Sequence, residues 1–538
     1  MKKRSVFTKR VLAMVLALTL FLAPATTAEA AVSSGNAMAM GIDVSFHQGA
    51  INWPAVAASG VKFAFIRIGS TKSGVDACFA ANMQGAQASG IKTGVYIYSY
   101  ANNVNEAINE ANLVISWLGD FAVNMPVVYD IENSNQKVLD SGTIQAMCNA
   151  FCQTIDAAGY YPMVYSSKNW FTSKIGNIGY DKWVAQYNTA CDYPGALAFW
   201  QASSSGQIAG VNTRVDIDYQ YKDYSTLIIP TGFLPRADGN VRFYNNYKMV
   251  RGWIDFNNTR YYTDAAGNLV RNQWFTDANG TYYFTPTDGS IARGQMAVDG
   301  VNYYFDATGA RKTGWIPLET GKFYYDPATA AMVKGWFTDP SGIYYLSPED
   351  GHAAVGAVAI DGNNFYFDAN GIRQTGWLNL GTGMYYYDPA TGAMIKGWFA
   401  DTKGMHYLDA TDGHMVTGLV TIEKNNFLFD ANGILQTGKQ VIGDAAYFFD
   451  QTTGAMTYGL CNSVDGNAYY TGKDGKMVAG LVTINGQQFY FDPTTFAVVR
   501  NTQIQVGNVI YVIDANGVAV PLPPAAPAAP APAATPAK

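Results

Sequence analysis

The chain has 538 residues, which is more than one hydrophobic core usually serves, so two or more domains are expected. Its formal net charge is −6, and the first thirty residues hold five Lys/Arg against one Glu, which leaves about −10 for the remainder. This negative balance argues against nucleic acid as the main partner.

The amino-terminal segment has the pattern of an export signal. "MKKRSVFTKR" is basic, "VLAMVLALTLFLAP" is apolar, and "AEA" at 28–30 fits a signal-peptidase site. We therefore expect a signal peptide over 1–30, a linker over 31–40 and a secreted mature protein. The apolar run is short for a membrane span and no later run is long enough, so no span is expected in the mature chain.

Residues 41–225 alternate between strand-like and helix-like stretches. Short apolar strands that alternate with helices indicate a parallel sheet covered on its outside. Eight strands in so short a segment predict an incomplete barrel with five βα units plus three further strands, and in such barrels the carboxyl ends of the strands line the site. The expected strands are 41–46, 61–68, 91–100, 126–132, 161–166, 182–187, 196–201 and 215–221, and the expected helices are 52–59, 76–89, 104–118, 141–158 and 167–173.

Two acids lie at the end of one of these strands in "VVYDIEN", residues 127–133. Side chains alternate along a strand, so Asp130 and Glu132 point the same way. A single acid here would often be a helix N-cap. A close pair instead favours a functional site, because repulsion and burial push the pKa values of two carboxyls apart.

Further acids and aromatics fall on the strands of the same segment. Asp43 lies in the first strand and Asp216 in the last, and these strands are neighbours if the barrel closes. Acids among aromatic rings suit carbohydrate, because rings stack on sugars while carboxyls transfer protons. Each ring taken singly is more often packing, and Trp200 in particular is expected in the core. The candidate substrate-binding residues are Tyr96, Tyr98, Tyr165, Trp183, Tyr187 and Gln201.

Several linked motifs resemble the glycoside hydrolase family 25 lysozymes. They are "GIDVSFHQGAINW", "FAFIRIG", "GVYIYSY", "VVYDIEN", "WVAQY", "FWQ" and "VDIDYQY", in the expected order over about 41–220. The resemblance implies an incomplete β/α barrel that cleaves the β-1,4 bond between N-acetylmuramic acid and N-acetylglucosamine. It places the catalytic Glu at Glu132 and the accompanying acids at Asp43, Asp130 and Asp216. Asn52 stands where the family more often has Asp, and either residue can cap a helix.

The chemistry can also be argued from the residues. The leaving oxygen needs a proton, so Glu132, which is longer and flanked by negative charge, is expected to be the acid. Asp130 would stay ionised and stabilise positive charge at the anomeric carbon. The family is thought to use the substrate's N-acetyl group as nucleophile, with retention of configuration, and the sequence leaves direct attack by Asp130 open.

From about 241 to 520 the pattern changes to a repeat. Positions aligned on "GW" recur in steps of 20 or 21, and every third is spaced by 62. Each unit pairs an aromatic run with a Gly-containing turn such as "DANG", which predicts a solenoid of β-hairpins. Residues 226–240 are expected to be a linker, and the Pro/Ala-rich tail 521–538 to be extended.

These repeats resemble the choline-binding-type repeats of Gram-positive surface proteins. In such repeats aromatic rings hold a quaternary ammonium through their quadrupole. A purely structural role of the rings in the hairpin core is the alternative, and a glucan or another wall polymer is an alternative ligand. The candidate residues are Trp253, Trp274, Trp315, Trp336, Trp377 and Trp398. From position 419 onward the aligned residue is Leu or Lys, so ligand contacts are expected mainly within 250–410.

No cofactor and no metal site are expected. Cys148 and Cys152 are spaced unfavourably for a disulfide bridge, the other cysteines show no metal-ligand spacing, and the four histidines are scattered. The Asp-rich turns lack the additional acids that a calcium site needs.

The sequence thus predicts a secreted, wall-associated muramidase of a Gram-positive-type bacterium, which acts on peptidoglycan and is anchored by its repeats. Two alternatives stay open: a wall-bound adhesin that binds glycan without cutting it, and a hydrolase of another polysaccharide such as chitin.

Overall fold

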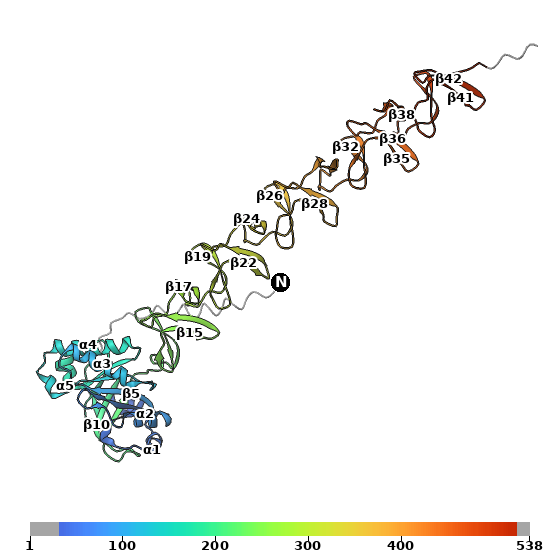
Figure 1. The fold of residues 1–538 in the computed structure, drawn as a ribbon. Helices are drawn as coiled ribbons and strands as arrows, with labels where there is room; N and C mark the ends of the chain where they lie inside the picture. Colours follow the sequence, from blue (N-terminus) through green and yellow to red (C-terminus); the bar gives the residue numbers. More distant parts are fainter. Residues whose placement is uncertain (1–31, 524–538) are drawn as a thin grey trace, which may run out of the picture. The chain divides into compact units, whose positions relative to one another are not determined.

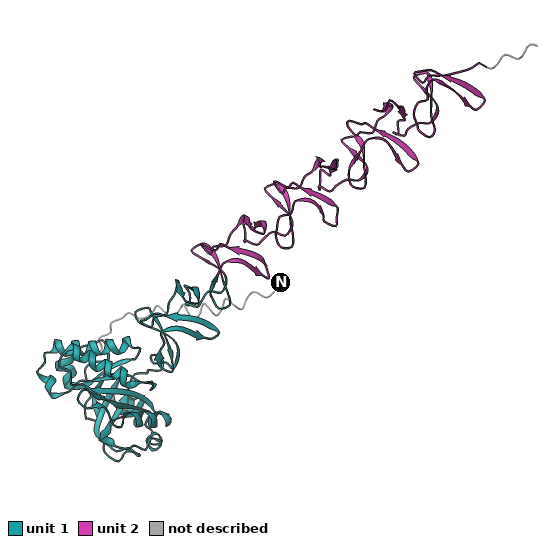
Figure 2. Ribbon diagram, in the orientation of Figure 1, with its two compact units in different colours: residues 1–294, 305–311 teal, residues 295–304, 312–538 magenta. Residues whose placement is uncertain are grey.

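The structure is a computed structural model that describes residues 32–523 (Figure 1). The expected signal peptide and residues 524–538 of the tail lie outside the described residues. The chain forms two compact units (Figure 2). The first contains the α/β domain, continues to Gly294 and includes Phe305–Arg311, and the second consists of Gln295–Tyr304 and the chain from Lys312 onward.

The α/β domain is barrel-like. Its sheet has the strand order β2-β11-β10-β8-β7-β6-β5-β3-β4, and an additional β2–β3 pairing joins the first strand to the other side of the sheet. Only the pairings of β11 with β2 and β10 and of β4 with β3 are antiparallel. The strands are β2 (Ala39–Val44), β3 (Phe63–Ser70), β4 (Gly74–Val75), β5 (Lys92–Tyr98), β6 (Val127–Asp130), β7 (Pro162–Ser167), β8 (Asp181–Ala185), β10 (Phe199–Gly206) and β11 (Val215–Gln220).

All eight strands expected from the sequence are present, and the five expected helical segments each contain a helix. Asn52 caps the first helix by accepting a hydrogen bond from the Ala55 amide, as expected for its position. The helices are α1 (Trp53–Ala58), α2 (Phe79–Ala88), α3 (Val104–Leu118), α4 (Ser141–Ala157) and α5 (Lys168–Trp170), the last followed by a π-helical turn, η4 (Phe171–Ile175). The smaller elements are β1 (Val32–Ser33), β9 (Ala190–Cys191) and the 3₁₀ turns η1 (Ser34–Asn36), η2 (Phe46–Gln48) and η3 (Ser134–Val138).

Alternation along the strands separates two apolar clusters. On β3, Ala64, Ile66 and Ile68 belong to the cluster that packs against the helices. Phe63 and Phe65 point to the opposite face and belong to the inner cluster. Residues that continue the inner face at the carboxyl ends of the strands therefore reach the mouth of the barrel.

The first hairpins are joined to the α/β domain by hydrogen bonds and ion pairs. The expected linker 226–240 contains β12 (Thr231–Pro235), which pairs with β13 (Val241–Asn245), and β14 (Lys248–Met249) completes the sheet. Arg236 and Arg242 both pair with Asp156 near the end of α4, and Lys248 donates to the Gly119 carbonyl at the end of α3 at 2.7 Å. These cations lie where the helix dipoles favour positive charge.

The remaining residues form successive β-hairpins, as the repeat pattern predicts. Many hairpin tips have two residues in the left-handed region, such as Asn257 and Asn258 with φ of 50° and 60°, which is the conformation of a type I′ turn. Asp368 accepts the Asn370 and Ile372 amides at 2.8 and 2.9 Å, so this turn carboxylate binds backbone N–H groups.

The paired strands that begin in the first unit are β15–β16 (Gly252–Phe256, Thr259–Thr263), β17–β18 (Gln273–Asp277, Gly280–Phe284) and β19–β20–β21 (Gly294–Val298, Val301–Phe305, Arg311–Lys312). Those of the second unit up to Leu408 are β22–β23 (Gly314–Leu318, Gly321–Tyr325), β24–β25 (Gly335–Asp339, Gly342–Leu346), β26–β27 (Gly356–Ile360, Asn363–Phe367), β28–β29 (Gly376–Asn379, Met384–Tyr387) and β30–β31 (Gly397–Ala400, Met405–Leu408). The last are β32–β33–β34 (Gly418–Ile422, Asn425–Phe429, Leu435–Gln436), β35–β36 (Gly438–Ile442, Ala445–Phe449), β37–β38 (Gly459–Asn462, Ala468–Thr471), β39–β40 (Gly480–Ile484, Gln487–Phe491) and β41–β42–β43 (Thr502–Val506, Val509–Ile513, Ala519–Pro521). Among the described residues, no helix is both long and apolar enough to cross a membrane.

Candidate active site and aromatic sites

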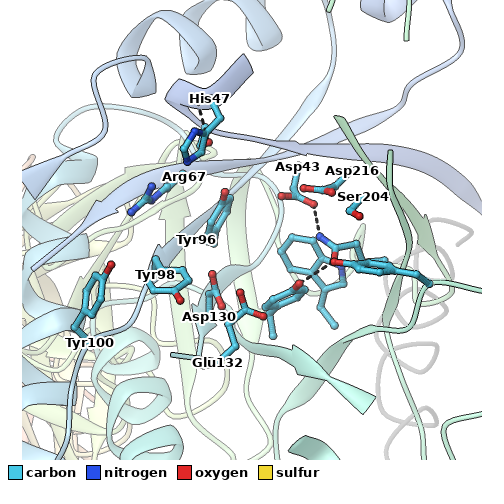
Figure 3. Close-up of a pocket in the computed structure, with 15 residues that line it drawn as sticks. Asp43, His47, Arg67, Tyr96, Tyr98, Tyr100, Asp130, Glu132, Ser204 and Asp216 are labelled. Carbon is cyan, nitrogen blue, oxygen red and sulfur yellow. Dashed lines mark hydrogen bonds between the residues drawn. The ribbon is translucent and has the colours of Figure 1, made fainter. Parts of the chain in front are cut away.

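A pocket of about 430 Å³ opens at the carboxyl ends of the barrel strands (Figure 3). It collects side chains from strands that are far apart in the sequence. All four acids and all six substrate-binding residues expected from the sequence line it. The lining residues are Asp43, Ser45, His47, Arg67, Tyr96, Tyr98, Tyr100, Asp130, Glu132, Tyr165, Trp183, Tyr187, Gln201, Ser204 and Asp216.

Asp130 and Glu132 form the acidic pair at the end of β6. Asp130 is only 4% exposed, and its Oδ1 has no hydrogen-bond partner among the described residues. Burial raises the pKa of Asp130 well above its ordinary value, Glu132 adds to the rise, and Arg67 opposes it. Burial also raises the pKa of Glu132, and the charge of Asp216 adds to this rise. Because both carboxyls resist ionisation, a state with one proton on the pair is favoured.

This result differs in one respect from the expectation based on side-chain length. That expectation puts the proton on Glu132 and leaves Asp130 ionised, whereas burial raises the pKa of both carboxyls. The physical reason is position, because the shorter side chain is enclosed at the end of the strand while Glu132 reaches further toward solvent.

A second pair of acids comes from the strands that close the sheet. Asp43 and Asp216 are cross-strand partners of β2 and β11. Burial and the charges of Asp218 and Asp216 raise the pKa of Asp43 well above its ordinary value. Burial also raises the pKa of Asp216, although a hydrogen bond with Asp43 opposes that rise.

Gln201 connects the aromatic side of the pocket to Asp43. Its Nε2 donates to Asp43 Oδ2 at 2.7 Å, while its Oε1 accepts from the hydroxyls of Tyr165 at 2.7 Å and Tyr187 at 3.1 Å. Tyr165 is buried, whereas Tyr187 is 60% exposed. Gln201 therefore orients an acid, and Tyr187 is an exposed ring of the pocket lining.

Two tryptophans of the α/β domain are buried and expose almost no surface on which a sugar could stack. Trp183 lines the pocket but is only 1% exposed, because it stacks on Phe65 and donates to Asp218 Oδ1 at 2.8 Å. Trp200 is equally buried and donates to the Gln186 carbonyl, which agrees with its expected place in the core.

Five further lining residues were not among the candidates from the sequence. Arg67 had a usable signal, because it interrupts the apolar strand "FAFIRIG" as Asp130 interrupts "VVYDIEN". The residues missed are Ser45, His47, Arg67, Tyr100 and Ser204.

The tryptophans of the repeats fall into two structural classes. In the first class the indole N–H donates to an Asp in the next hairpin. Trp315 donates to Asp339 at 2.8 Å, packs on Tyr324, Phe337 and Tyr344, and has Lys322 Nζ 4.0 Å from its ring centroid. The equivalent bonds are Trp253 to Asp277 and Trp377 to Asp401, and Arg260 lies over Trp253. This class has a packing role in the hairpin core.

The second class is more open. Trp336 and Trp398 are each 43% exposed, and each contacts a Tyr of its own hairpin and a Phe of the next at ring distances near 5 Å. Trp274 holds the same place in the first unit, where it contacts Tyr283 and Phe305 and lies beneath Arg311. The exposed surfaces of Trp336 and Trp398 are accessible to a ligand.

One group in the repeats brings metal-ligand residue types together. Asp409, Asp412 and His414 offer ligand atoms within 4.8 Å of one another, although the sequence pattern predicts no metal site. Asp412 Oδ1 contacts His414 Nδ1 at 2.6 Å, and Asp409 accepts the Thr411 and Asp412 amides. These contacts explain the group as an acidic turn.

Comparisons with known proteins follow the same division of the chain. Residues 42–211 match the profile described as glycosyl hydrolases family 25. Residues 354–396 and 416–459 match a choline-binding repeat, and 272–291 match a cell wall binding repeat.

Three relatives illustrate these similarities. YegX of Escherichia coli K12 is 29% identical over 188 residues, which is 33% of this chain and 68% of that protein. Lysozyme M1 of Streptomyces globisporus is 28% identical over 193 residues, 33% of this chain and 65% of that protein. The solved structure of the autolysin LytC of Streptococcus pneumoniae is 29% identical and covers 34% of this chain and 46% of that chain, with a TM-score of 0.32. Residues 42–211 therefore form a glycosyl hydrolase family 25 domain, and the hairpin array that follows it contains choline-binding repeats.

Proposed function

We propose that this protein is a peptidoglycan muramidase that hydrolyses the β-1,4 bond between N-acetylmuramic acid and N-acetylglucosamine. The observation that carries the proposal is the pocket in which the Asp130–Glu132 pair faces Asp43 and Asp216 among aromatic rings. Glycosidic bond cleavage needs one carboxyl that keeps its proton and a second that ionises, and a cleft with two neighbouring carboxyls can supply both. The family membership of residues 42–211 supports the same reaction.

Glu132 is the proposed general acid. Protonation of the leaving oxygen requires a carboxyl that keeps its proton toward neutral pH. Burial and the negative charge of Asp216 both raise the pKa of Glu132, which supports this role. Glu132 also reaches further into the open pocket than Asp130.

Asp130 is proposed to stabilise charge at the anomeric carbon. Its unpartnered Oδ1 could accept the N–H of a substrate N-acetyl group, and such a bond favours the ionised carboxylate. The acetamido oxygen would then attack with retention of configuration, and direct attack by Asp130 is the competing route. Asp43, oriented by Gln201, and Asp216 would hold the substrate on the other side.

The repeats are proposed to attach the enzyme to the wall. Exposed Trp336 and Trp398, each angled against neighbouring rings, suit a quaternary ammonium such as choline. The first-class tryptophans would contribute mainly by holding adjacent hairpins together.

The finer assignments are also proposals. The α/β domain would be an incomplete TIM-like barrel of five βα units plus three strands, supported by the strand order and by the short helix after β7. We assign the catalytic domain to 41–225 and the wall-binding array to 241–520, and we propose that the protein is exported by a Gram-positive-type bacterium.

The product of digestion tests the reaction. Purified full-length protein is incubated with defined peptidoglycan, and the released muropeptides are reduced with borohydride and analysed by mass spectrometry. Muramitol ends are expected. Glucosaminitol ends would indicate a glucosaminidase, and the absence of any cleavage in solution and in a peptidoglycan zymogram would support a glycan-binding adhesin. Cleavage of chitin oligomers at an equal rate would favour the other-polysaccharide alternative.

A further inference from the structure

Arg67 is a cation in the pocket that pairs with no anion of the described chain. It follows Phe63 and Phe65 on the inner face of β3 and is the one residue of that strand that is not buried. Its Nε is shielded from solvent and has no hydrogen-bond partner, and no ion pair of Arg67 occurs within residues 32–523. A guanidinium has five N–H donors, and leaving them unused in a partly buried site is unfavourable.

Two aromatic rings hold Arg67 in place. Its Cζ lies 5.7 Å from the ring centroids of Phe46 and of Tyr98, which come from η2 and β5. Cation–π contacts attract the guanidinium without using its N–H groups as hydrogen-bond donors. The side chain is thus positioned by its neighbours while its donors stay available.

The simplest alternative is that Arg67 neutralises Asp130. Its charge does oppose the rise in the pKa of Asp130. If that were its main role, a direct ion pair would be expected, because both groups line one pocket and Asp130 Oδ1 lacks a partner within the described chain. In Figure 3, Arg67 lies on the other side of Tyr96 from Asp43 and Asp216, close to Tyr98.

We propose that Arg67 binds a carboxylate of the glycan substrate and so determines its specificity. The inference rests on the proposed muramidase function. Chitin and the peptidoglycan glycan share the β-1,4-linked hexosamine backbone, and the muramic residue adds a lactyl ether that ends in a carboxyl group. In intact peptidoglycan this carboxyl is an amide and the carboxylates are on the stem peptide. A guanidinium can hold either carboxylate through two parallel N–H···O bonds.

Three substrates separate the two sources of the carboxylate. They are peptide-free glycan strands with a free lactyl carboxylate, the same strands after methyl esterification, and strands that keep their stem peptides. A lactyl contact predicts that the wild type prefers the free acid over its ester by about ten- to a hundredfold in kcat/KM, as for a hydrogen bond to a charged group. A stem-peptide contact predicts instead that the wild type prefers the strands with stem peptides over both kinds of peptide-free strand by a similar factor in kcat/KM.

The variants then assign that preference to Arg67. In Arg67→Met the ratio of kcat/KM between the preferred and the less preferred substrate should fall close to one, mainly through a change in KM. Arg67→Lys should retain part of the preference. Lys72→Met is the matched control, because Lys72 Nζ lies 4.0 Å from the Tyr100 ring but does not line the pocket, and it should leave the ratio unchanged. Circular dichroism and thermal unfolding verify the fold of each variant.

Binding to the Glu132→Gln protein, measured by calorimetry with the same three substrates, tests Arg67 independently of cleavage. If the wild type cleaves nothing, the proposed function fails while this binding comparison still decides the role of Arg67. Equal losses on all three substrates in Arg67→Met, with a displaced pH profile, would mean that Arg67 acts through Asp130. That result, or a wild type without preference in kcat/KM and in binding, would overturn the inference.

Discussion

Asp43 of β2 and Asp216 of β11 lie directly opposite each other in the antiparallel strand pair that closes the barrel-like sheet. Burial raises the pKa of both acids, and a hydrogen bond between the two carboxyls adds slightly to the rise at Asp43 and opposes it at Asp216. Asp216 therefore carries negative charge more readily, and this charge acts on Glu132. The acids from the two sides of the pocket are electrostatically linked.

The link predicts how Asp216→Asn changes the pH dependence of hydrolysis. The charge of Asp216 raises the pKa of Glu132, so its removal lowers that pKa and Glu132 loses its proton at lower pH. The alkaline limb of the kcat profile should move toward acidic pH. Asp223→Asn, which changes an exposed acid outside the pocket, should leave the limb in place. A shift toward alkaline pH in Asp216→Asn would contradict the assignment of Glu132 as the acid.

Glu132→Gln should abolish hydrolysis without unfolding the protein. The amide keeps the shape of the side chain but has no transferable proton, and loss of general acid catalysis typically lowers the rate about 10²- to 10⁴-fold. Turnover of soluble glycan strands and the far-ultraviolet circular dichroism spectrum are the two measurements. Glu106→Gln makes the same exchange at an exposed helix start, outside the pocket, and should keep full activity. Turnover above a few per cent of wild type in Glu132→Gln would exclude Glu132 as the acid.

Asp218→Asn should stabilise the α/β domain, most strongly at alkaline pH. Asp218 is fully buried, and burial together with the charge of Asp216 raises its pKa well above the ordinary value of 3.8. The folded state therefore loses stability as the pH rises from 3.8, the ordinary pKa, to the raised pKa of the folded state. Asn cannot ionise, so the substitution removes this loss of stability. Trp183 could still donate to the amide oxygen.

Thermal unfolding at pH 4 and pH 8 tests the effect of Asp218→Asn. A higher Tm is expected, by about 2–4 °C for each kcal/mol in a unit of this size, with the larger gain at pH 8. An equal or lower Tm at pH 8 would show that the charged form of Asp218 is satisfied in the fold.

Trp336→Ala and Trp315→Ala should have different effects. Trp336 is 43% exposed, so its loss should weaken binding to choline-containing wall with little change in stability. Trp315 is bonded to Asp339 and packs on Tyr324, so its removal should lower the Tm of the array. Co-sedimentation with wall and thermal unfolding separate the two outcomes. Equal wall binding by a 440–520 fragment, which lacks every candidate tryptophan, would contradict ligand binding by Trp336.

A fragment that ends at 225 should cleave soluble strands but unfold at lower temperature than one that ends at 294. The longer fragment keeps the β12–β14 sheet and the pairing of Arg236 and Arg242 with Asp156. Ending at 235 instead leaves β12 without its partner strand β13. Loss of activity in a folded 32–225 fragment would show that the first hairpins support the pocket.

Much of the architecture is determined by local pattern. The period-two alternation in "VVYDIEN" places Asp130 and Glu132 on one side of the chain, and the fixed spacing of turns and aromatics produces the hairpins. These features depend on residues close in sequence, so backbone geometry and turn chemistry suffice to predict them. The four acids and six substrate-binding candidates also line one pocket, because their strand ends meet once the sheet closes.

Only the tertiary structure decided which side chains are buried, which are paired and which are exposed to solvent. It enclosed Asp130 more than Glu132, it placed Arg67 between two rings and paired it with no anion of the described chain, and it divided the repeat tryptophans into bonded and exposed classes. It also turned the expected linker into strand β12. Periodicity fixes the direction of a side chain, whereas its pKa and free surface depend on the dielectric and the neighbours that distant segments bring to it.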